Sequence, residues 1–207
     1  MKKRLFDITL SSVGLVLASV PMFALFVLSR AQNGGKGFFL HERVGKDLKT
    51  FDVYKIQSLR EEFNGQSSFL TTSNHVTPLF DSIRRRGLDE LPQFINILKG
   101  EMSFVGPRPI PPNEYEKTKP PVGTYKVRPG ITSPYVVWSL SEGRNDDSVK
   151  QRLDLEYAQA PFSIRKDLGI LARTFLPAVL GKSPQTYDAK TSEDILPEAP
   201  EETKDLG

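Results

Sequence analysis

Residues 84–93 read RRRGLDELPQ and place two adjacent carboxylates beside three arginines. Proline is tolerated in the first turn of a helix and not in its interior, so Pro92 predicts a helix that begins near residues 88–90. Asp89 and Glu90 then lie at its N-terminus, where the helix dipole favours ionised carboxylates and the amides and arginines form an anion site. An ionised aspartate among guanidinium groups is suited to attack a phosphoryl centre as a nucleophile.

The same stretch also has a purely structural interpretation. Asp89 would be the N-cap of the helix, Glu90 a first-turn residue that the dipole favours, and the arginines a solvated surface. A helix of this kind does not identify an enzyme by itself, so the spacing alone leaves both interpretations open.

Arg108 stands between two prolines in residues 106–109, which read GPRP. Each proline holds its φ near −65°, so the backbone beneath the guanidinium is stiff before any ligand arrives. Arginine suits a planar, forked contact with a phosphate or a nucleobase, although proline pairs also occur in structural turns. Arg128, before Pro129, and Arg144, before Asn145, repeat the arrangement less sharply, and an ordinary surface loop is the alternative for both.

Several other chemistries are disfavoured. The chain has no cysteine, which excludes disulfides and thiolate sites, and His41 and His75 lack metal-ligand spacing. There is no nucleophile-elbow, Walker A or dinucleotide-binding pattern. The aromatic residues lie in apolar runs and are not interleaved with basic ones, so we expect no nucleic acid partner.

The first element that must position these residues is apolar. Residues 8–29 carry no charge, and 15 of these 22 residues are Ala, Val, Ile, Leu, Met or Phe. At ~1.5 Å per residue a helix of this length reaches ~33 Å, enough to cross a hydrocarbon core of ~30 Å. The sequence therefore predicts a membrane element.

Two features favour a helix that enters and leaves by the same membrane face. Pro21 removes an amide donor in the middle of the run and predicts a kink, while Ser19 can satisfy a freed backbone group. Basic residues flank both ends, and the positive-inside rule places both flanks in the cytoplasm. We expect residues 1–32 to form a re-entrant helix hairpin; a kinked spanning helix and a secretory signal are the alternatives.

The remaining chain supports one compact domain, and we expect an α+β, mainly helical fold with interfacial amphipathic helices. Residues 33–181 form the cytoplasmic catalytic domain in this prediction, and residues 182–207, with three lysines against seven acidic groups, form an acidic, disordered tail. The first 181 residues carry about +7, from 25 basic minus 18 acidic groups, which suits an anionic membrane surface or a phosphorylated substrate.

Local patterns predict the elements of this domain. Residues 50–56 alternate polar and apolar side chains as a strand that pairs with the stretch at Phe38, and residues 79–86 form a short helix. Leu88, Leu91, Ile95 and Leu98 form a helical stripe that Gly100 ends. Residues 61–78 are a loop, residues 106–134 a proline-rich loop with little regular structure, and residues 149–180 an amphipathic region interrupted near Pro161.

The order of these motifs resembles the bacterial sugar transferases, the monotopic polyprenyl-phosphate phosphoglycosyl transferases. The similarity runs from about residue 3 to 181, as in the minimal, catalytic-domain form of the family. Its motifs are KRLFD at residues 3–7, an apolar segment broken by proline, FF at 38–39, RVG at 43–45, YK at 54–55, LDELPQ at 88–93, GEMSFVGPRP at 100–109, VRPGIT at 127–132 and GRN at 143–145.

The resemblance implies an activity. Such enzymes transfer a sugar 1-phosphate from a UDP-sugar to a polyprenyl phosphate such as undecaprenyl phosphate, with Mg²⁺, and release UMP in the first membrane step of glycan assembly. Asp89 would be the nucleophile that forms a covalent phosphosugar intermediate and would lie at the Mg²⁺ site. Glu90 would assist it as a base or positioning group.

The resemblance also assigns the other residues. Arg84 matches a phosphate-binding arginine of the family, and Arg108 matches the arginine of its Pro-Arg-Pro loop. Arg128 and Arg144 lie in two further motifs of the family and would bind substrate. The segment broken at Ser19 and Pro21 would hold the site at the cytoplasmic face of the bacterial inner membrane. The sequence leaves a homo-oligomer open, and residues 133–142 depart from the family pattern, so a catalytically inactive membrane-tethered binding or scaffold protein is the alternative.

Overall fold

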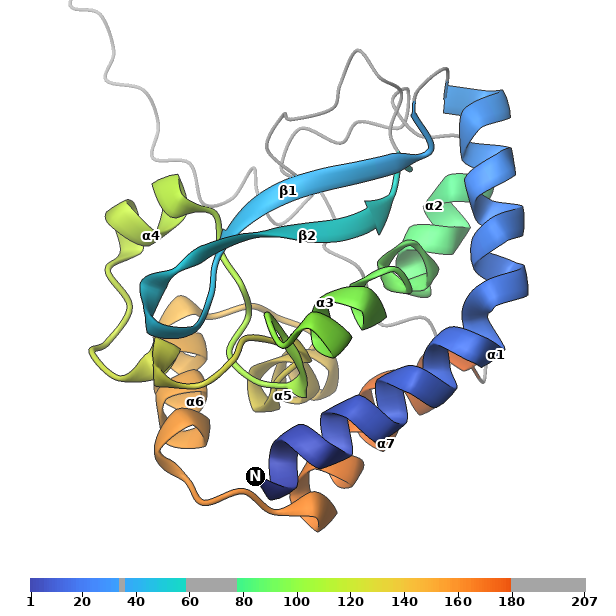
Figure 1. Cartoon of the computed structure of the whole chain (residues 1–207). Helices are drawn as coiled ribbons and strands as arrows, with labels where there is room; N and C mark the ends of the chain where they lie inside the picture. Colours follow the sequence, from blue (N-terminus) through green and yellow to red (C-terminus); the bar gives the residue numbers. More distant parts are fainter. Residues whose placement is uncertain (34–35, 59–77, 180–207) are drawn as a thin grey trace, which may run out of the picture.

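Helices dominate the part of the chain that the computed structural model describes, which comprises residues 1–33, 36–58 and 78–179 (Figure 1). The helices are α1 (Lys2–Asn33), α2 (Pro78–Arg85), α3 (Gln93–Lys99), α4 (Pro112–Thr118), α5 (Pro134–Glu142), α6 (Asp147–Gln159) and α7 (Ile164–Val179). The strands are β1 (Phe38–Val44), β2 (Thr50–Ile56), β3 (Ser103–Val105) and β4 (Gly130–Thr132), in two small sheets. The mainly helical α+β class is confirmed.

α1 is one long apolar helix with Pro21 inside it. Its length and composition are sufficient to cross a membrane, and only 17% of its most apolar window is buried. The helix changes direction midway (Figure 1), as expected where a proline interrupts the ladder of helical hydrogen bonds. The expected kink is therefore present, in one bent helix and not in two separate ones; the return of both ends to one membrane face stays a prediction.

Ser19 does not bond to the carbonyl that Pro21 frees. Its hydroxyl donates to the carbonyl of Val16 at 2.8 Å, whereas the carbonyl four residues before Pro21 belongs to Leu17. The interaction is the local type by which a hydroxyl bonds back to the preceding turn and favours bending of a helix.

The two arms of α1 pack on two different apolar clusters. Near the N-terminus, Leu10 contacts a core that includes Val53, Ile97 and Met102. Beyond the bend, Leu25 belongs to a second core with Ile56, Phe80 and Ile83. The bend thus lets one helix cover both clusters of the domain.

Polar contacts tie both ends of α1 to the same domain. Arg4 donates to the carbonyls of Ile97 and Leu98 and so caps the end of α3, where helix carbonyls lack intrahelical partners. Lys3 pairs with the buried Asp167 of α7 at 2.6 Å. At the other end, the Ser29 hydroxyl donates to the carbonyl of Gln57 at 2.5 Å.

The predicted hairpin of residues 38–56 is confirmed. β1 and β2 are antiparallel, with Phe38 opposite Ile56 and Val44 opposite Thr50. Asn96 of α3 holds the free edge of β2: its Nδ2 donates to the carbonyl of Asp52 at 2.7 Å, and its Oδ1 accepts from the amide of Tyr54 at 3.0 Å. One side chain therefore fixes the hairpin relative to α3.

α3 begins later than predicted and buries a second face. Residues 88–90 form a 3₁₀ turn, the regular helix starts at Gln93, and it ends at Gly100 with a φ of 87°, as predicted. The apolar stripe faces α1, where the ring of Phe94 lies against Gly14 and Leu91 packs on the second core. The opposite face, Gln93, Asn96 and Ile97, is also buried because α3 lies between α1 and β2 (Figure 1).

Residues 106–134 are more regular than the prolines predicted, since they contain α4 and β4. β4 pairs with β3 in parallel, with Ser103 opposite Gly130 and Val105 opposite Thr132. Gly106 and Gly130 let the two backbones touch: a Cβ built on Gly130 would lie 2.2 Å from the Gly106 nitrogen. The prediction of irregular loop was wrong here because pairing is a long-range interaction.

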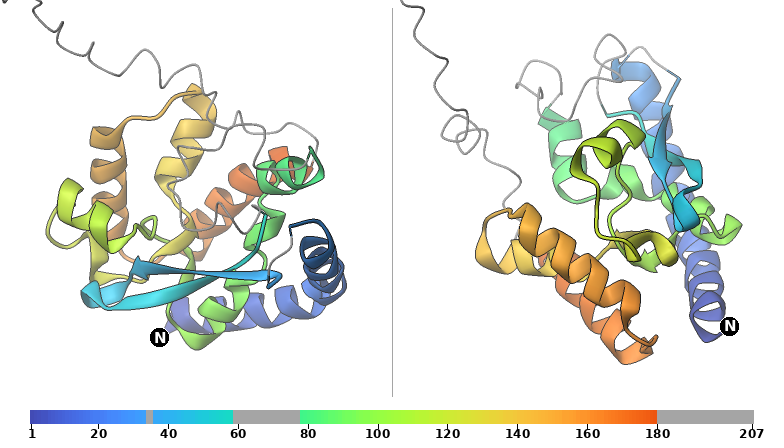
Figure 2. Two further views of the ribbon diagram at one scale, coloured as in Figure 1. Left: turned by 90° about the horizontal axis from the view of Figure 1, so that it is seen from above. Right: turned by 90° about the vertical axis from the view of Figure 1, so that its left-hand side faces the viewer.

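The C-terminal helices complete the domain. The amphipathic region is confirmed as α6 and α7, with the break at residues 160–163, and both helices lie on the opposite side of the molecule from β1 and β2 (Figure 2). α7 exposes Ile164, Leu168, Phe175 and Leu176, so its interfacial placement stays a prediction. The predicted loop at residues 61–77, His75 and the tail 182–207 lie outside the described residues.

Candidate active site

Asp89 and Glu90 occupy the 3₁₀ turn between α2 and α3. Gly87 enters the turn with a φ of 68°, a left-handed conformation that side chains with a Cβ avoid. The turn carries Asp89 into the protein, where 8% of it is exposed, and leaves the Glu90 side chain 30% exposed. The neighbouring carboxylates therefore have different surroundings.

Cations from three elements lie around this turn: one from β2, one from α2 next to the turn, and one from the loop after β3. Lys55 of β2 forms an ion pair with Glu90, with 2.6 Å between Nζ and Oε1. Arg84, at the end of α2, is close enough to Asp89 for its charge to lower the pKa of that carboxyl. Arg108, in the loop after β3, acts in the same way on Glu90. The fold thus brings Arg84, Arg108, Asp89 and Glu90 together, as the resemblance predicts.

The two carboxyl groups have opposite pKa shifts. Burial raises the pKa of Asp89 above its usual value, against the charges of Lys55 and Arg84. Burial also acts on Glu90, but the charge and hydrogen bond of Lys55, with help from Arg108, outweigh it and lower its pKa. Glu90 is thus ionised as expected, but Lys55 and Arg108, and not a helix dipole, lower its pKa; for Asp89 desolvation is larger than the effect of the nearby positive charges.

Arg43 adds a cation without a full set of partners. Its Nη2 donates to Nδ1 of His41 at 3.1 Å, and its buried Nη1 has no hydrogen-bond partner among the described residues. Burial and the nearby charge of Arg108 lower the pKa of Arg43 to about 10, so it is still charged at neutral pH. Two guanidinium groups close together with a free donor form a site for an anion such as phosphate.

The Arg108 side chain is exposed, whereas Pro107 before it and Ile110 two residues after it are buried. Hydrogen bonds hold this backbone from two sides. The Tyr125 hydroxyl donates to the Arg108 carbonyl at 2.9 Å, and the Arg108 amide donates to Oδ2 of Asp154 at 3.4 Å. These tertiary hydrogen bonds therefore add to the stiffness that the flanking prolines predict for the loop.

Arg128 and Arg144 are placed elsewhere. Arg128 donates from Nε to the carbonyl of Gly100 at 2.6 Å, at the opposite end of α3 from Asp89. Arg144 follows α5, and its guanidinium lies over the Trp138 ring, 5.5 Å from the centroid. Among the described residues, no contact joins either arginine to the two carboxylates, so their substrate-binding role stays a prediction.

The comparison with known proteins now bears on this geometry. The profile described as "Bacterial sugar transferase" matches residues 1–181, a range that contains every residue named above. The chain belongs to the bacterial sugar transferase family.

Three relatives show the range of this similarity. This sugar transferase is 34% identical over 199 residues to "Exopolysaccharide production protein ExoY" of Rhizobium meliloti, across 86% of this chain and 85% of that protein. It is 33% identical to "Undecaprenyl-phosphate glucose phosphotransferase" of Komagataeibacter xylinus, across 88% of this chain and 37% of that protein. It is 34% identical to "Undecaprenyl-phosphate galactose phosphotransferase" of Salmonella typhimurium, across 83% of this chain and 39% of that protein.

Sequence reasoning assigned no role to Lys55 and Arg43 of this transferase. A signal was available, because directly paired residues of an antiparallel hairpin point to the same face. Lys55 pairs with Phe39 and Arg43 with Phe51, so Lys55, His41 and Arg43 share the face that meets the 3₁₀ turn. The alternation predicted the strands but not which face would meet Asp89 and Glu90.

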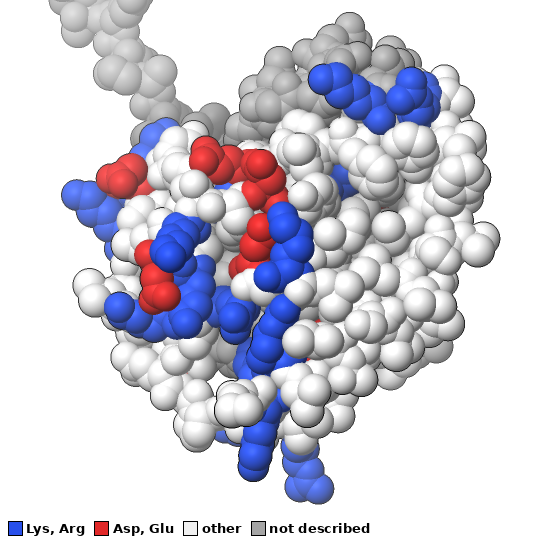
Figure 3. All heavy atoms as spheres, in the orientation of Figure 1, with Lys and Arg blue, Asp and Glu red and all other residues white. Residues whose placement is uncertain are grey.

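The charges of the transferase are confined to one part of the visible surface. In Figure 3 acidic and basic groups gather over β1, β2 and α4, whereas the surface of α1 is almost uncharged apart from its ends. The uncharged surface of α1 is therefore suited to contact with lipid.

Asp89 and Glu90 are the side chains of this site that could hold a Mg²⁺ ion. Among the described residues there is no cluster of three or more His, Cys, Asp or Glu side chains, so an all-protein metal cage is not formed there. Mg²⁺ usually binds through one or two carboxylates together with substrate phosphates and water. Asp89 and Glu90 supply such oxygen ligands beside an anion site.

Proposed function

We propose that this transferase moves a sugar 1-phosphate from a UDP-sugar to a polyprenyl phosphate such as undecaprenyl phosphate, and releases UMP. The observation that carries the proposal is the pair of carboxylates at Asp89 and Glu90 among positive charges. Lys55 and Arg84 act on Asp89, and Lys55, Arg108 and Arg43 act on Glu90. The two relatives named as undecaprenyl-phosphate phosphotransferases support the lipid acceptor.

The proposed mechanism has two displacements at phosphorus. A carboxylate oxygen of Asp89 attacks the phosphate that bears the sugar, an aspartyl–phosphosugar bond forms, and the bond to UMP breaks with the electron pair leaving on UMP. An oxygen of the polyprenyl phosphate then attacks the same phosphorus and restores the Asp89 carboxylate. Each step exchanges one P–O bond for another, as nucleophilic catalysis requires.

The surrounding residues have separate tasks in this proposal. Arg84, Arg43 and Arg108 neutralise the diphosphate and stabilise charge on the leaving group. Glu90, held by Lys55, assists as base or positioning group. Asp89, with Glu90, would hold Mg²⁺, which when bound would supply further neutralisation of phosphate charge.

The proposal places the catalytic domain, residues 33–181, on the cytoplasmic face of the bacterial inner membrane. Its support is that both ends of α1 bond to that domain, through Lys3 and Asp167 at one end and Ser29 and Gln57 at the other. A re-entrant α1 satisfies both contacts, and the exposed apolar residues of α7 suit the interface. The lipid phosphate then reaches Asp89 without leaving the headgroup layer.

The test is UMP release by the purified full chain from a panel of UDP-sugars, with undecaprenyl phosphate and Mg²⁺. Asp89→Asn is expected to abolish release, and intact-mass analysis of the parent without acceptor should detect an added sugar phosphate that this variant lacks. Glu116→Gln, an exposed change on α4, is the matched control and should retain activity. An active Asp89→Asn variant would contradict the mechanism, and no UMP from any donor would favour the scaffold alternative.

A further inference from the structure

His41 lies on the face of β1 that meets the 3₁₀ turn, and the mechanism above gives it no role. Its side chain is half-buried, and its ring packs edge-to-face on Phe39 with 5.6 Å between the ring centroids. Across the hairpin it is paired with Val53, which is 2% exposed in the apolar core. The register places Lys55 opposite Phe39, and Arg43 follows His41 on the same face. The histidine therefore lies between the two cations that this hairpin brings to the carboxylates.

The contact between His41 and Arg43 determines the form of the imidazole. Nη2 of Arg43 lies 3.1 Å from Nδ1 of His41. A guanidinium group has only donors, so Nδ1 must accept and the ring proton lies on Nε2. Burial, together with the charges of Arg43 and Lys55, lowers the pKa of His41 to about 4, so the ring is neutral at neutral pH. His41 is thus a neutral acceptor for a charged donor.

The Arg43 guanidinium is not paired with a carboxylate. Within the part of the chain that the structure describes it forms no ion pair, although the charges of Glu90 and Glu114 act on it from farther away. A carboxylate in the place of His41 would hold the guanidinium equally well, but it would also cancel the positive charge that an anion requires. The neutral imidazole holds the group and leaves its charge available.

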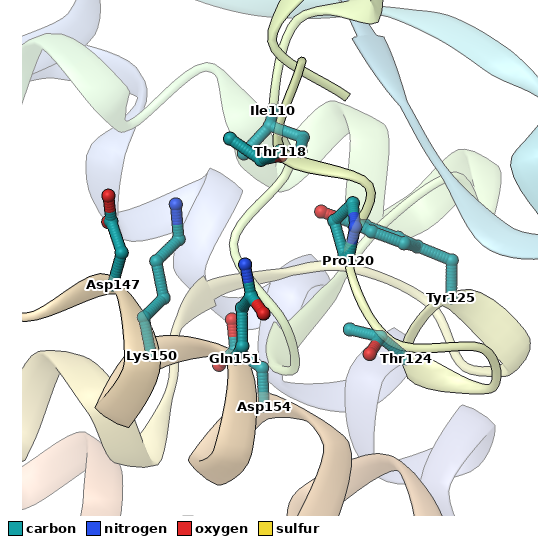
Figure 4. Close-up of a pocket in the computed structure, with 9 residues that line it drawn as sticks. All are labelled: Ile110, Thr118, Pro120, Thr124, Tyr125, Asp147, Lys150, Gln151 and Asp154. Carbon is teal, nitrogen blue, oxygen red and sulfur yellow. The ribbon is translucent and has the colours of Figure 1, made fainter. Parts of the chain in front are cut away.

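Arg108, the other arginine close to Arg43, is held in a different way. Tyr125 and Asp154 bond to its backbone, and Figure 4 shows these two side chains lining a small pocket. The positive charges of Arg108 and Arg43 act against each other, which favours separation of the two guanidinium groups. The hydrogen bond from Arg43 to His41 opposes this separation.

We infer that His41 is a positioning residue for phosphate binding: its neutral imidazole holds the Arg43 guanidinium near Arg108, so that both arginines meet the diphosphate of the donor. The inference rests on the proposed function. Two guanidinium groups that are already ordered bind a diphosphate more strongly, because little further conformational entropy is lost on binding. His41 does not touch the reacting atoms in this arrangement and acts through Arg43.

Three substitutions of His41 separate the properties of the imidazole. His41→Asn retains a neutral acceptor near the position of Nδ1, His41→Phe retains a ring against Phe39 but has no acceptor, and His41→Asp retains an acceptor but adds a negative charge. Glu42→Gln, exposed on the opposite face of the same strand, is the matched control. Calorimetric titration of the detergent-solubilised full chain with UDP measures diphosphate binding, and steady-state kinetics with the UDP-sugar measure KM and kcat.

We expect His41→Phe to raise Kd for UDP about tenfold and to lower kcat/KM by at least as much, because the misplaced arginine also stabilises the leaving group less well. His41→Asn should stay within about twofold of the parent, and His41→Asp should weaken UDP binding about tenfold or more. The reverse order, an unaffected Phe variant and an impaired Asn variant, would show that His41 only fills space and would overturn the inference. Equal values in all variants would also overturn it.

A double-mutant cycle tests whether His41 acts through Arg43. In the Arg43→Met background the partner is absent, so His41→Phe should cause no further loss of UDP binding. The same loss in both backgrounds would mean that His41 acts independently of Arg43, and the inference would be wrong. The cycle does not use His41→Asn, so it also decides the matter if that variant is unfolded, as judged by its melting temperature.

The positioning role and the proposed function fail in different ways. A parent that binds UDP but transfers no sugar contradicts the function and leaves the role of His41 to the titrations. A parent that transfers sugar while every His41 variant matches it contradicts the role of His41 alone. A parent that neither binds UDP nor transfers sugar contradicts both.

Discussion

At the level of single residues, the site depends on the different environments of two adjacent carboxyl groups. Asp89 is buried and its pKa is raised, whereas Glu90 bonds to Lys55 and its pKa is lowered. A carboxylate that has lost water but retains its charge is a better nucleophile than a hydrated one, while an ion-paired neighbour stays negative and fixed. The pairing resembles other sites in which environment separates the roles of two acids.

This difference predicts a pH dependence. Asp89 must be ionised to attack, so kcat/KM for UMP release should fall as pH drops through its raised pKa, at a higher pH than an ordinary aspartate would cause. Lys55→Met removes the charge that lowers the pKa of Asp89, so the fall should move to still higher pH. A pH profile of both proteins measures this, and an unmoved acidic limb in the variant would contradict the assignment.

Arg43 provides a second prediction at this scale. Its Nη1, which has no hydrogen-bond partner among the described residues, is expected to bind the diphosphate, and lysine cannot supply the same forked donors. Arg43→Lys should raise KM for the UDP-sugar about tenfold or more, since a hydrogen bond to a charged group contributes about 1.5–3 kcal/mol. Arg152→Lys, an exposed change on α6, is the control; equal KM values in the two variants would argue against a contact with substrate.

At the level of elements, the loop that carries Arg108 depends on two strands that touch. Gly106 and Gly130 lie at the contact between β3 and β4, where the missing side chains let backbone atoms approach. The loop that follows β3 then passes over Asp154 and Tyr125, which hold its backbone. The placement of one guanidinium group is thus a property of the small sheet and of α6 together.

Gly130→Ala should therefore destabilise the protein. Its Cβ would lie 2.2 Å from the Gly106 nitrogen, and because backbone cannot move aside cheaply we expect a loss of about 2 kcal/mol or more. Gly169→Ala is the matched control. Gly169 lies in α7, and a Cβ added there would meet no neighbouring atom within 4 Å, so alanine should stabilise the protein by about 0.5–1 kcal/mol. Melting temperatures of the detergent-solubilised proteins compare them, and similar values would contradict the steric argument.

At the level of the whole molecule, α1 is both the membrane element and a structural part of the catalytic domain. Its N-terminal arm caps α3 through Arg4 and pairs with α7 through Lys3, and its C-terminal arm packs on Ile56 and Phe80. A helix held at both ends by one domain cannot easily deliver those ends to opposite sides of a bilayer. The bend at Pro21 is what makes both contacts compatible with insertion.

The absence of cysteine makes the topology directly testable. Single cysteines at Lys2 and Lys36, both exposed, should react with an impermeant reagent from the same side of the membrane. A cysteine at Glu116 of α4 reports the side of the catalytic domain and should label with them. Labelling of Lys2→Cys from the opposite side would show that α1 spans, and the re-entrant proposal would then be wrong.

Local interactions in the sequence predicted much of this protein. The apolar run and Pro21 predicted a bent membrane helix, alternation predicted the hairpin of β1 and β2, and Gly100 predicted the end of α3. The arginines and Pro92 next to Asp89 and Glu90 predicted an anion-binding turn, although their spacing alone left a purely structural interpretation open. Each of these depends on forces between residues close in sequence.

The tertiary structure alone decided which distant residues meet. It placed Lys55 and Arg43 beside the carboxylates and Arg128 at the far end of α3, and it buried Asp89 deeply enough for desolvation to outweigh the charges of Lys55 and Arg84. It also paired β4 with β3 inside a proline-rich stretch. Burial and long-range pairing depend on the packing of the whole chain, and local sequence patterns do not encode them.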